Sequence, residues 1–421
     1  MSLRLLAGRC AGVEARVNVP PSKSLTNRAL LAAAVAGGGL VHNPLDCDDT
    51  RRLATALATA GWELEWRTSI EVGSRTTPPS PVRLDLGDSG TGARFVIALL
   101  AAVPGSATVD GSRRLRERPM QPLLAALVEL GAVLESARGF LPVRITGARL
   151  EGGSARISPG ASSQFVSALL LVAPCLRAGL DLELAGPVPS RPYLDLTEDV
   201  LRCFGGDVAR DLEGRRWRVG PQPLRRAAYS VEGDWSAAAF FLGAAAVAGG
   251  SVELTPLSLD SRQGDRALCA ILSGAGMVIS GAQDRVRATG PVVRPITADL
   301  RDAPDLFPAL AVVAACAPAG SRLSGLDNLR HKESDRLTSM VDNLRRLGAG
   351  LEVERDSVIV TRPLDRGSRS SEVKVGAAGD HRIAMAMAVA ALAAGPLELD
   401  DGGCVQKSFP GFWQAWSGVA R

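Results

Sequence analysis

Six segments of the sequence place charged and hydroxyl side chains directly before long apolar runs. The first, PSKSLTNRALLAAAVAGG at residues 21–38, sets Lys23, Ser24 and Arg28 against alanines and leucines. A helix start has free backbone N–H groups and the positive end of the helix dipole, so it attracts anions. Serine and threonine are ordinary N-caps there, but a cation opposes the dipole unless an anion lies between them. The cations therefore indicate contacts to an anionic ligand.

The other five segments repeat this arrangement about every 65–75 residues, a period long enough for several strands and two helices. They are GDSGTGARFVIALLAAVPG from Gly87, SSQFVSALLLVAPC from Ser162, EGDWSAAAFFLGAAAVAGG from Glu232, DAPDLFPALAVVAACAPAG from Asp302 and GDHRIAMAMAVAALAAG from Gly379. Short β-like stretches such as LDLELAG and SVELTPL follow the apolar runs. More amphipathic helices come next, including DDTRRLATALATAG and KESDRLTSMVDNLRRLGAG, with a weaker sixth at KSFPGFWQAWSGVA. The alternation predicts an α/β protein of six repeats.

The length of 421 residues predicts two domains with three repeats each. Helices that are apolar all round belong in a domain core, whereas amphipathic helices lie nearer solvent. Six buried helices can then direct six polar starts at one cleft. We expect residues 1–17 to join 230–421 in one domain, because the C-terminal half needs a closing strand, and 18–229 to form the other.

Composition excludes several classes of function. The formal net charge of +4, from 48 basic and 44 acidic residues, gives no basic stripe for a nucleic acid. Seven scattered cysteines without a CxxC pair, and three separated histidines, predict neither a disulfide framework nor a metal site. No apolar run reaches the roughly 20 residues of a membrane helix. We expect a soluble protein of the cytoplasm, without a signal peptide.

Further polar side chains also lie at predicted helix starts. The glycine-rich turn GDSGTGAR lets backbone amides approach a charged group, but it matches neither a P-loop nor a dinucleotide fingerprint. Arg118 is equally consistent with a surface charge and with a bidentate anion clamp. Hydroxyl, amide and aromatic groups occur at Ser162, Ser163, Gln164, Ser190 and Tyr193, although capping and packing are their default roles.

The densest charged stretch is NLRHKESDRL, residues 328–337. A solvated helical face is the usual explanation, yet an i,i+4 spacing would project Lys332 and Arg336 together from one helix. Glu333 and Asp305 are the carboxylates that could move protons. Lys407 follows a strand and precedes a helix start. Cations, hydroxyls and two carboxylates without a metal cluster or activated nucleophile suit an enzyme that binds small, multiply anionic substrates and uses acid–base and electrostatic catalysis.

Eight motifs of this sequence resemble motifs of the 5-enolpyruvylshikimate-3-phosphate (EPSP) synthase family, and they occur in the same order as in that family. They are PSKSLTNRALLAA, GDSGTGAR, RERPMQPL, SSQFVSALL, RPYLDLT, VEGDWSAAAFFL, NLRHKESDRL and GDHRIAMAMAVAA. The resemblance implies transfer of the enolpyruvyl group of phosphoenolpyruvate to the 5-hydroxyl of shikimate 3-phosphate, a step towards chorismate and the aromatic amino acids. It implies a two-domain inside-out α/β barrel of six βαβαββ repeats, with the active site in the interdomain cleft. No metal or organic cofactor is implied, and we expect a monomer.

The resemblance also implies a role for each matching residue. Catalysis would fall to Lys23, Asp305 and Glu333, with Asp305 as the base at the 5-hydroxyl and Glu333 and Lys23 handling the proton at the methylene carbon. Shikimate 3-phosphate would be bound by Ser24, Arg28, Ser162, Ser163, Gln164, Ser190, Tyr193, Asp305, Asn328 and Lys332. Phosphoenolpyruvate, and the competing herbicide glyphosate, would be bound by Lys23, Gly90, Arg118, Gln164, Arg336, Arg382 and Lys407.

Two positions depart from the family pattern. Asp88 stands where an asparagine is common, and Phe95 stands where many members carry proline, so both bear on glyphosate sensitivity. The nearest rival is UDP-N-acetylglucosamine enolpyruvyl transferase, which usually has a cysteine in the loop that here reads VDGSRRLRERP. RNA 3′-phosphate cyclase is more distant. A non-catalytic anion-binding protein would keep the cations but tolerate loss of Asp305 and Glu333.

Overall fold

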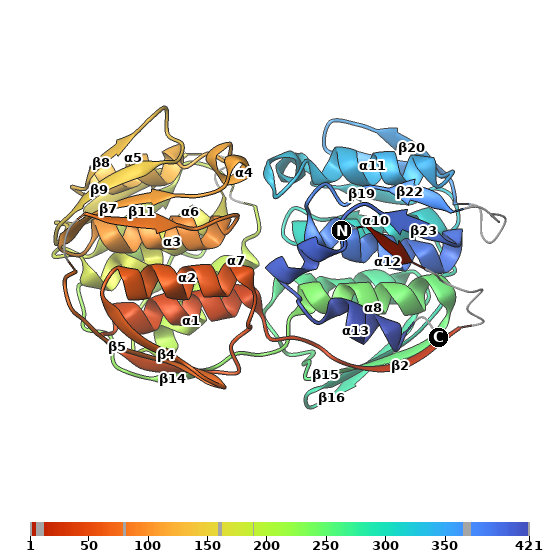
Figure 1. The fold of residues 1–421 in the computed structure, drawn as a ribbon, viewed down its shortest axis with the longest axis horizontal. Coiled ribbons are helices and arrows are strands. Elements are labelled where there is room, and N and C mark those ends of the chain that lie inside the picture. Colours follow the sequence, from red (N-terminus) through yellow and green to blue (C-terminus); the bar gives the residue numbers. More distant parts are fainter. Residues whose placement is uncertain are drawn as a thin grey trace. The chain divides into compact units, whose positions relative to one another are not determined.

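The computed structural model describes residues 2–5, 12–78, 81–158, 162–187, 189–364 and 372–419. The chain divides into two compact units. Unit 1 contains Met1–Pro20 and Gly233–Arg421, and unit 2 contains Pro21–Glu232. Figure 1 colours unit 2 from red to yellow-green and the long segment of unit 1 from green to blue.

Unit 2 consists of three four-stranded sheets around three buried helices (Figure 1). The strands, in sheet order, are β14 (Ala228–Ser230), β3 (Gly39–His42), β5 (Ser69–Arg75) and β4 (Trp62–Trp66); β6 (Val82–Asp85), β7 (Gly105–Asp110), β9 (Val143–Gly147) and β8 (Val133–Ser136); β10 (Gly153–Ile157), β11 (Leu180–Leu184), β13 (Arg216–Val219) and β12 (Ala209–Arg210). The first two strands of each sheet are parallel and the other neighbours are antiparallel.

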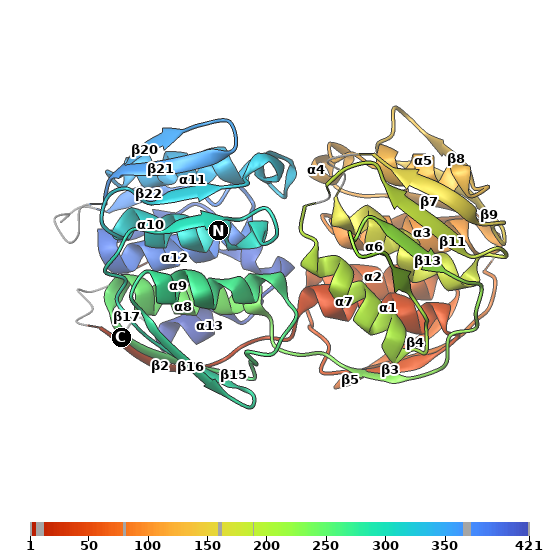
Figure 2. The ribbon, with the colours of Figure 1, turned by 180° about the vertical axis from the view of Figure 1, so that it is seen from behind.

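Two kinds of helix alternate along unit 2. The inner helices are α1 (Lys23–Val35), α3 (Gly90–Ala101) and α6 (Ser163–Val172), which are buried over almost their whole length. The more amphipathic ones are α2 (Asp48–Thr59), α5 (Gln121–Glu129) and α7 (Pro192–Cys203). A short helix, α4 (Arg113–Arg116), precedes α5. The view from behind shows the sheets of this unit covering its helices (Figure 2).

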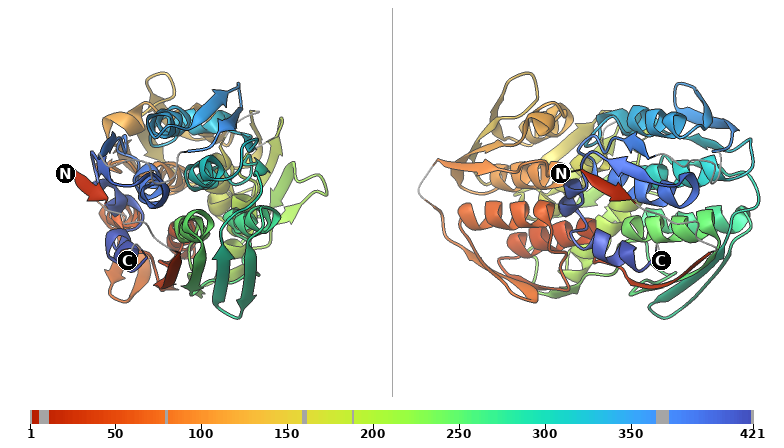
Figure 3. Two further views of the ribbon diagram at one scale, coloured as in Figure 1. Left: turned by 90° about the vertical axis from the view of Figure 1, so that its right-hand side faces the viewer. Right: turned by 45° about the vertical axis from the view of Figure 1, so that its right-hand side comes forward.

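Unit 1 repeats the plan with one sheet of three strands and two of four. In sheet order they are β1 (Leu3–Leu5), β23 (Leu397–Leu399) and β22 (Val373–Val375); β16 (Val278–Ala282), β17 (Arg285–Gly290), β15 (Gly250–Thr255) and β2 (Val13–Asn18); β18 (Thr297–Asp299), β19 (Arg322–Ser324), β21 (Ser357–Arg362) and β20 (Gly350–Val353). The N-terminal strand β1, red in Figure 3, pairs antiparallel with the blue strand β23.

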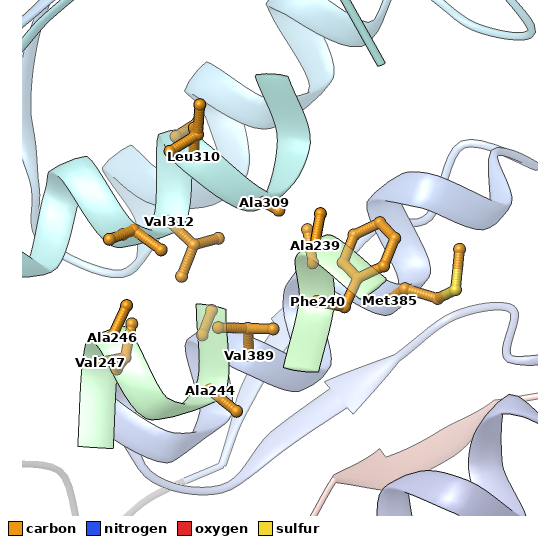
Figure 4. Packing of buried hydrophobic residues seen from close by; sticks show 14 of the residues in the cluster. Ala239, Phe240, Ala244, Ala246, Val247, Ala309, Leu310, Val312, Met385 and Val389 are labelled. Atoms are coloured by element: carbon orange, nitrogen blue, oxygen red, sulfur yellow. The ribbon is translucent and has the colours of Figure 1, made fainter. Parts of the chain in front are cut away.

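The inner helices of unit 1 are α8 (Trp235–Ala248), α10 (Phe307–Cys316) and α12 (His381–Ala394), which pack against one another (Figure 4). Small residues allow this close approach. A Cβ atom on Gly243 would lie 3.5 Å from Val389 and 3.6 Å from Val313, so alanine would fit there and a larger side chain would not. The outer helices are α9 (Leu268–Gly274), α11 (Arg336–Arg346) and α13 (Phe412–Ser417).

In four of the six repeats, the inner helix connects two parallel strands of the same sheet, for example β6–α3–β7. The remaining two repeats exchange their first strands. The strand β2 leads into α1 but pairs with β15, whereas β14 leads into α8 but pairs with β3. This exchange explains why the chain passes from unit 1 into unit 2 and returns only once.

The structure confirms the α/β class, the six repeats and the burial of the apolar helices. Within the described part of the chain, no helix is long and apolar enough to cross a membrane. The cysteine Cys10 lies outside the described residues, and the six described cysteines are free thiols.

Candidate active site

Lys23 is the first residue of α1, and its ammonium donates to Oδ2 of Asp49 over 2.8 Å. Asp49 lies in the first turn of α2, where the helix dipole favours a negative charge. The two side chains are only 14% and 7% exposed. This pair shows how a cation is held at the start of a buried helix.

Arg28, one turn further along α1, is 1% exposed. Its guanidinium donates to Thr197 Oγ1 at 2.9 Å, to Ser167 Oγ at 3.1 Å and to the Ser24 carbonyl at 3.0 Å, below the ring of Tyr193. It forms no ion pair with any described residue. Burial lowers the pKa of Arg28 to about 10, so the group is still charged at neutral pH. A buried cation without a carboxylate partner is suited to an anionic ligand.

Gly90 begins α3 and lies against two buried arginines. A Cβ atom at this position would come within 2.4 Å of Nη1 of Arg118 and 2.8 Å of Nη1 of Arg94. Arg94 also donates to Gln164 Oε1 at 2.7 Å and to the Gly90 carbonyl at 3.0 Å. Glycine is therefore required because the guanidinium groups occupy the space of a side chain.

The predicted hydroxyl groups of unit 2 are found at two more helix starts. Ser162 caps α6 by accepting from the Gln164 amide at 3.3 Å, and Ser163 follows as a buried residue. Ser190, also buried, precedes α7 with a positive φ of 62°. Tyr193 lies on α7, with its ring centroid 5.4 Å from the Arg28 guanidinium carbon. Arg28 and Tyr193 therefore belong to one cluster within unit 2.

Asp305 is the centre of the cluster in unit 1. It lies in η3, a turn of 3₁₀ helix (Pro304–Leu306) directly before α10. Its Oδ1 accepts from Arg336 at 2.7 Å and from Lys332 at 3.4 Å, and its Oδ2 accepts from Arg382 at 3.2 Å. Burial by itself would raise the pKa of Asp305, but the cations Arg382, Lys332 and Arg336 hold it well below its usual value.

Arg336 connects three carboxylates around this centre. Besides Asp305, it donates to Oε2 of Glu333 at 2.7 Å and, through Nε, to Oδ2 of Asp380 at 2.7 Å. Although burial opposes its charge, these three carboxylates raise the pKa of Arg336, so it stays fully ionised. The cluster is a network of buried ions in which Asp305, Glu333 and Arg336 come from one repeat and Asp380 from the next.

Two further predicted residues of unit 1 lie in short 3₁₀ turns. Lys407 is buried at the end of η5 (Gly403–Lys407), which packs against α12. Asn328 is half-buried in η4 (Asp327–His331), the 3₁₀ turn before Lys332.

Two details of the sequence interpretation were wrong. Lys332 and Arg336 do not share a helical face, because Lys332 has extended backbone at the end of η4 and α11 begins only at Arg336. The cause is Asp335, which caps α11 through the Thr338 amide. Both cations nevertheless contact Asp305. Lys407 is not at a helix start like the other polar residues, since it ends η5.

The sequence interpretation missed Asp380 and Asp49 as partners of site cations. Asp380 is the N-cap of α12 and is fully buried; it accepts from Arg336 and from Ser334. Asp49 pairs with Lys23. The sequence pattern predicts only an ordinary helix cap or a first-turn residue at both positions. An available signal for Asp380 was its position in GDHR, two residues before Arg382.

The structure also places the two departures from the family pattern. The Asp88 carboxylate is exposed and accepts a hydrogen bond from Ser112, the N-cap of α4. Phe95 is completely buried, and the Arg28 guanidinium lies 5.7 Å from its ring centroid. Phe95 thus packs beneath the arginine.

No group of three or more His, Cys, Asp or Glu side chains among the described residues is arranged to hold a metal ion. The two clusters instead present cations, hydroxyls and carboxylates. Such groups bind anions and transfer protons.

Solved structures of known proteins with a similar fold show to which class of protein this fold belongs. The fold is similar to that of EPSP synthase from Acinetobacter baumannii, with a TM-score of 0.80 and 28% identity over 99% of this chain and 98% of that chain. It is also similar to the fold of the enolpyruvyl transferase NikO from Streptomyces tendae, with a TM-score of 0.77 over 97% of that chain. The sequence identity to NikO is 18%, which indicates a shared fold alone. The fold is therefore that of the enolpyruvyl transferases.

Sequence comparisons give the family. The family model described as EPSP synthase (3-phosphoshikimate 1-carboxyvinyltransferase) matches residues 9–416. Two curated proteins of that enzyme name, from Syntrophobacter fumaroxidans and Methanoculleus marisnigri, are each 39% identical to this chain, over 96% of it and 97% of theirs. The chain belongs to the EPSP synthase family. It is an enzyme of the transferase class, and the rival UDP-N-acetylglucosamine enolpyruvyl transferase is not favoured.

Proposed function

We propose that the two clusters together catalyse transfer of the enolpyruvyl group of phosphoenolpyruvate to the 5-hydroxyl of shikimate 3-phosphate, with release of phosphate. The observation that carries this proposal is Asp305, a buried carboxylate held by Arg336, Lys332 and Arg382. A carboxylate beside several cations is suited to remove a proton from a hydroxyl group while the cations bind anionic substrates.

The same ion pairs give Asp305 a substrate-dependent basicity. In the protein without ligands, the three cations lower its pKa, so the carboxylate is a weak base. Substrate phosphate and carboxylate groups would compete for Arg336, Lys332 and Arg382. As the cations turn to the substrates, the pKa of Asp305 rises towards the value a general base needs. Binding of both substrates would thus activate the base.

The proposed reaction has two stages. In the addition, the 5-hydroxyl gives its proton to Asp305, its oxygen bonds to C2 of phosphoenolpyruvate, and C3 takes up a proton from Lys23 or Glu333. In the elimination, C3 returns a proton, the double bond between C2 and C3 forms again, and the C2–O bond to phosphate breaks. Glu333 lies beside Arg336, and Lys23 is held by Asp49, so each proton carrier has a charged partner.

The binding roles follow the chemistry of each cluster. The carboxylate of shikimate 3-phosphate would bind Ser24 and the buried Arg28, and its ring would lie near Tyr193, Gln164 and Asn328. Its phosphate would bind Ser162, Ser163, Ser190 and Lys332. Phosphoenolpyruvate, or glyphosate in its place, would bind Lys23, Gly90, Arg118, Gln164, Arg336, Arg382 and Lys407. Buried arginines and helix starts are the usual anion-binding groups of proteins.

We further propose that the two units are the two domains and that the substrates bind in a cleft between them. The reaction needs Lys23 from one unit and Asp305 from the other, which supports this arrangement. We also propose a monomer that works in a reducing cytoplasm, since the described cysteines are free thiols.

Phosphate release from purified protein, mixed with phosphoenolpyruvate and shikimate 3-phosphate without added nucleotide or metal, tests the proposal. Release should require both substrates and should collapse in Glu333→Gln. The matched control is Glu352→Gln, an exposed glutamate on β20, which should behave like the wild type. Absence of release in the wild-type protein would refute the proposal, and release with UDP-N-acetylglucosamine as acceptor would instead support the rival transferase.

A further inference from the structure

Asp265 is a buried carboxyl group of unit 1 that the proposed mechanism does not use. It lies in η2 (Gly264–Ala267), which packs against α8, and it is 2% exposed. Its Oδ2 accepts a hydrogen bond from Ser236, in the first turn of α8. Its Oδ1 is buried and has no hydrogen-bond partner among the described residues. Burying a carboxyl group with only one of its two oxygens hydrogen-bonded costs folding free energy, so its presence needs an explanation.

Three charged groups act on Asp265, and two of them belong to the proposed active site. These two are Asp305 in η3 and Arg382 in the first turn of α12, and the third is Asp234, the N-cap of α8. The helix α8 packs against both η3 and α12, which brings these elements to one place. The titratable groups closest to Asp265 in sequence are Arg266, which is exposed, and Cys269 on α9, whose thiol pKa burial raises to about 11.

The two buried aspartates have opposite environments. Asp305 has three cationic partners, which keep it ionised. Asp265 has a serine and two neighbouring carboxylates, with Arg382 as the opposing cation. Burial, followed by the charge of Asp305, raises the pKa of Asp265 to about 7, although Arg382 and Ser236 act in the opposite direction. Below about pH 7 the pair thus carries one proton, on Asp265, and it loses this proton as the pH rises further.

We propose that Asp265 is a positioning residue of the base site, which holds a proton beside Asp305 so that Arg382 remains available for phosphoenolpyruvate. The inference rests on the proposed roles of Asp305 and Arg382. While Asp265 is neutral, it adds no charge that holds Arg382, and the arginine can give up its hydrogen bond to Asp305 for the substrate. When Asp265 loses its proton, a second buried negative charge attracts Arg382 and repels the anionic substrate.

The alternative is that Asp265 only fastens η2 to α8 through Ser236. Asparagine separates the two explanations, because it keeps the size and the hydrogen-bond acceptor of a neutral aspartic acid but cannot ionise. A structural role predicts that Asp265→Asn changes the Michaelis constant by the same factor at every pH. A proton-holding role predicts that the factor changes with pH.

The test measures the Michaelis constant for phosphoenolpyruvate from about pH 6 to about pH 8.5 in the wild type and in Asp265→Asn. The ratio of the wild-type constant to the variant constant should rise about tenfold across this range, because ionised Asp265 weakens substrate binding. The control is Asp260→Asn, an exposed aspartate nearby in sequence, whose ratio should stay constant. A constant ratio for Asp265→Asn would overturn the proposal.

Infrared difference spectra of the ligand-free protein provide a readout that needs no activity. Raising the pH should remove a protonated carboxyl band in the wild type, and this change should be absent in Asp265→Asn. In Ser236→Ala the band should persist to higher pH, because the lost hydrogen bond stabilised the ionised form. A protonated carboxyl band that still disappears with rising pH in Asp265→Asn would refute the inference even if the enzyme is active, whereas a wild-type protein that releases no phosphate would refute the proposed function instead.

Discussion

Arg336 donates from Nη1 to Oδ1 of Asp305 over 2.7 Å, and this ion pair joins the start of α11 to the turn before α10. The arginine is proposed to bind phosphoenolpyruvate and the aspartate to act as the base. The substrate therefore competes with the base for one guanidinium group. In the ligand-free protein the ion pair keeps the base weak, and it also prevents a buried carboxylate from remaining uncompensated.

Replacing Asp305 by asparagine should lower kcat by about 10²–10⁴-fold, the usual contribution of a general base. The side chain keeps its size, but the proton acceptor is lost. Steady-state phosphate release measures the effect, and Asp299→Asn, at an exposed position on β18, is the matched control. A variant with wild-type kcat would mean that another group removes the proton from the 5-hydroxyl.

Arg28 and Arg336 are both 1% exposed, but only Arg336 has carboxylate partners. Burial lowers the pKa of Arg28 to about 10. The folded state therefore bears a cost for this charge below that pH, and between the folded and unfolded pKa values stability rises with pH. Arg28→Met should leave the free energy of unfolding unchanged or raise it by about 1–3 kcal/mol, whereas Arg336→Met should lower it by about 3–5 kcal/mol.

Chemical denaturation of both arginine variants measures these stabilities, and titration with shikimate 3-phosphate measures binding. Arg28→Met should weaken the affinity about 100-fold or more, since it removes a buried charge-assisted contact to the ligand carboxylate. Strong destabilisation together with normal affinity would show that Arg28 is a structural residue. The comparison with Arg336→Met then shows whether the lack of a carboxylate partner at Arg28 explains the difference in stability between the two variants.

The sequence was sufficient to predict features that depend on local order. The junction from Lys23 to the apolar run, and its five repetitions, predicted the inner helices and their polar starts. The cluster around Asp305 was not predictable in the same way, because residues 305 and 336 are distant in one repeat, residue 380 lies in the next, and they meet only through packing of α10, α11 and α12. The spacing of Lys332 and Arg336 wrongly predicted a shared helical face, because the cap at Asp335 starts a new helix between them.

Gly90→Ala should raise the Michaelis constant for phosphoenolpyruvate and the inhibition constant for glyphosate, and leave that for shikimate 3-phosphate nearly unchanged. The new Cβ atom would lie 2.4 Å from Nη1 of Arg118, so the arginine must move. Because the obstructed atom is the end of a flexible side chain, the fold should survive. The control is Gly220→Ala, where a Cβ atom meets nothing within 4 Å. Unchanged constants would place phosphoenolpyruvate away from Arg118.

Small-angle scattering tests the proposed cleft between the units. Each unit holds cations for its proposed ligands, and anions that bind both sets would favour a closed arrangement by neutralising them. The radius of gyration should therefore decrease when both substrates are added. Asp305→Asn can be used for this measurement, because the variant binds the substrates without consuming them. Either substrate alone should give a smaller change. The same radius with and without both ligands would contradict the proposed closure.

Asp265→Asn should stabilise the folded protein at about pH 8 and have little effect near pH 4. Burial and Asp305 raise the pKa of Asp265 to about 7, well above the value of about 3.9 in an unfolded chain. Between these values the folded state binds the proton more tightly, so the contribution of Asp265 to stability is full below about pH 4 and is lost as the pH rises to about 7. Above that, the folded protein contains an unfavourable buried charge.

Asparagine removes this charge, so the free energy of unfolding of the variant should exceed that of the wild type by an amount on the order of 2–4 kcal/mol at about pH 8. Urea-dependent hydrogen exchange of the α8 amides measures the local stability of unit 1 at the two pH values. Ser236→Ala, which removes only the hydrogen bond to Asp265, should not reproduce the pH dependence. Equal effects of Asp265→Asn at both pH values would mean that Asp265 is ionised throughout this range, and that its proton plays no part in the site.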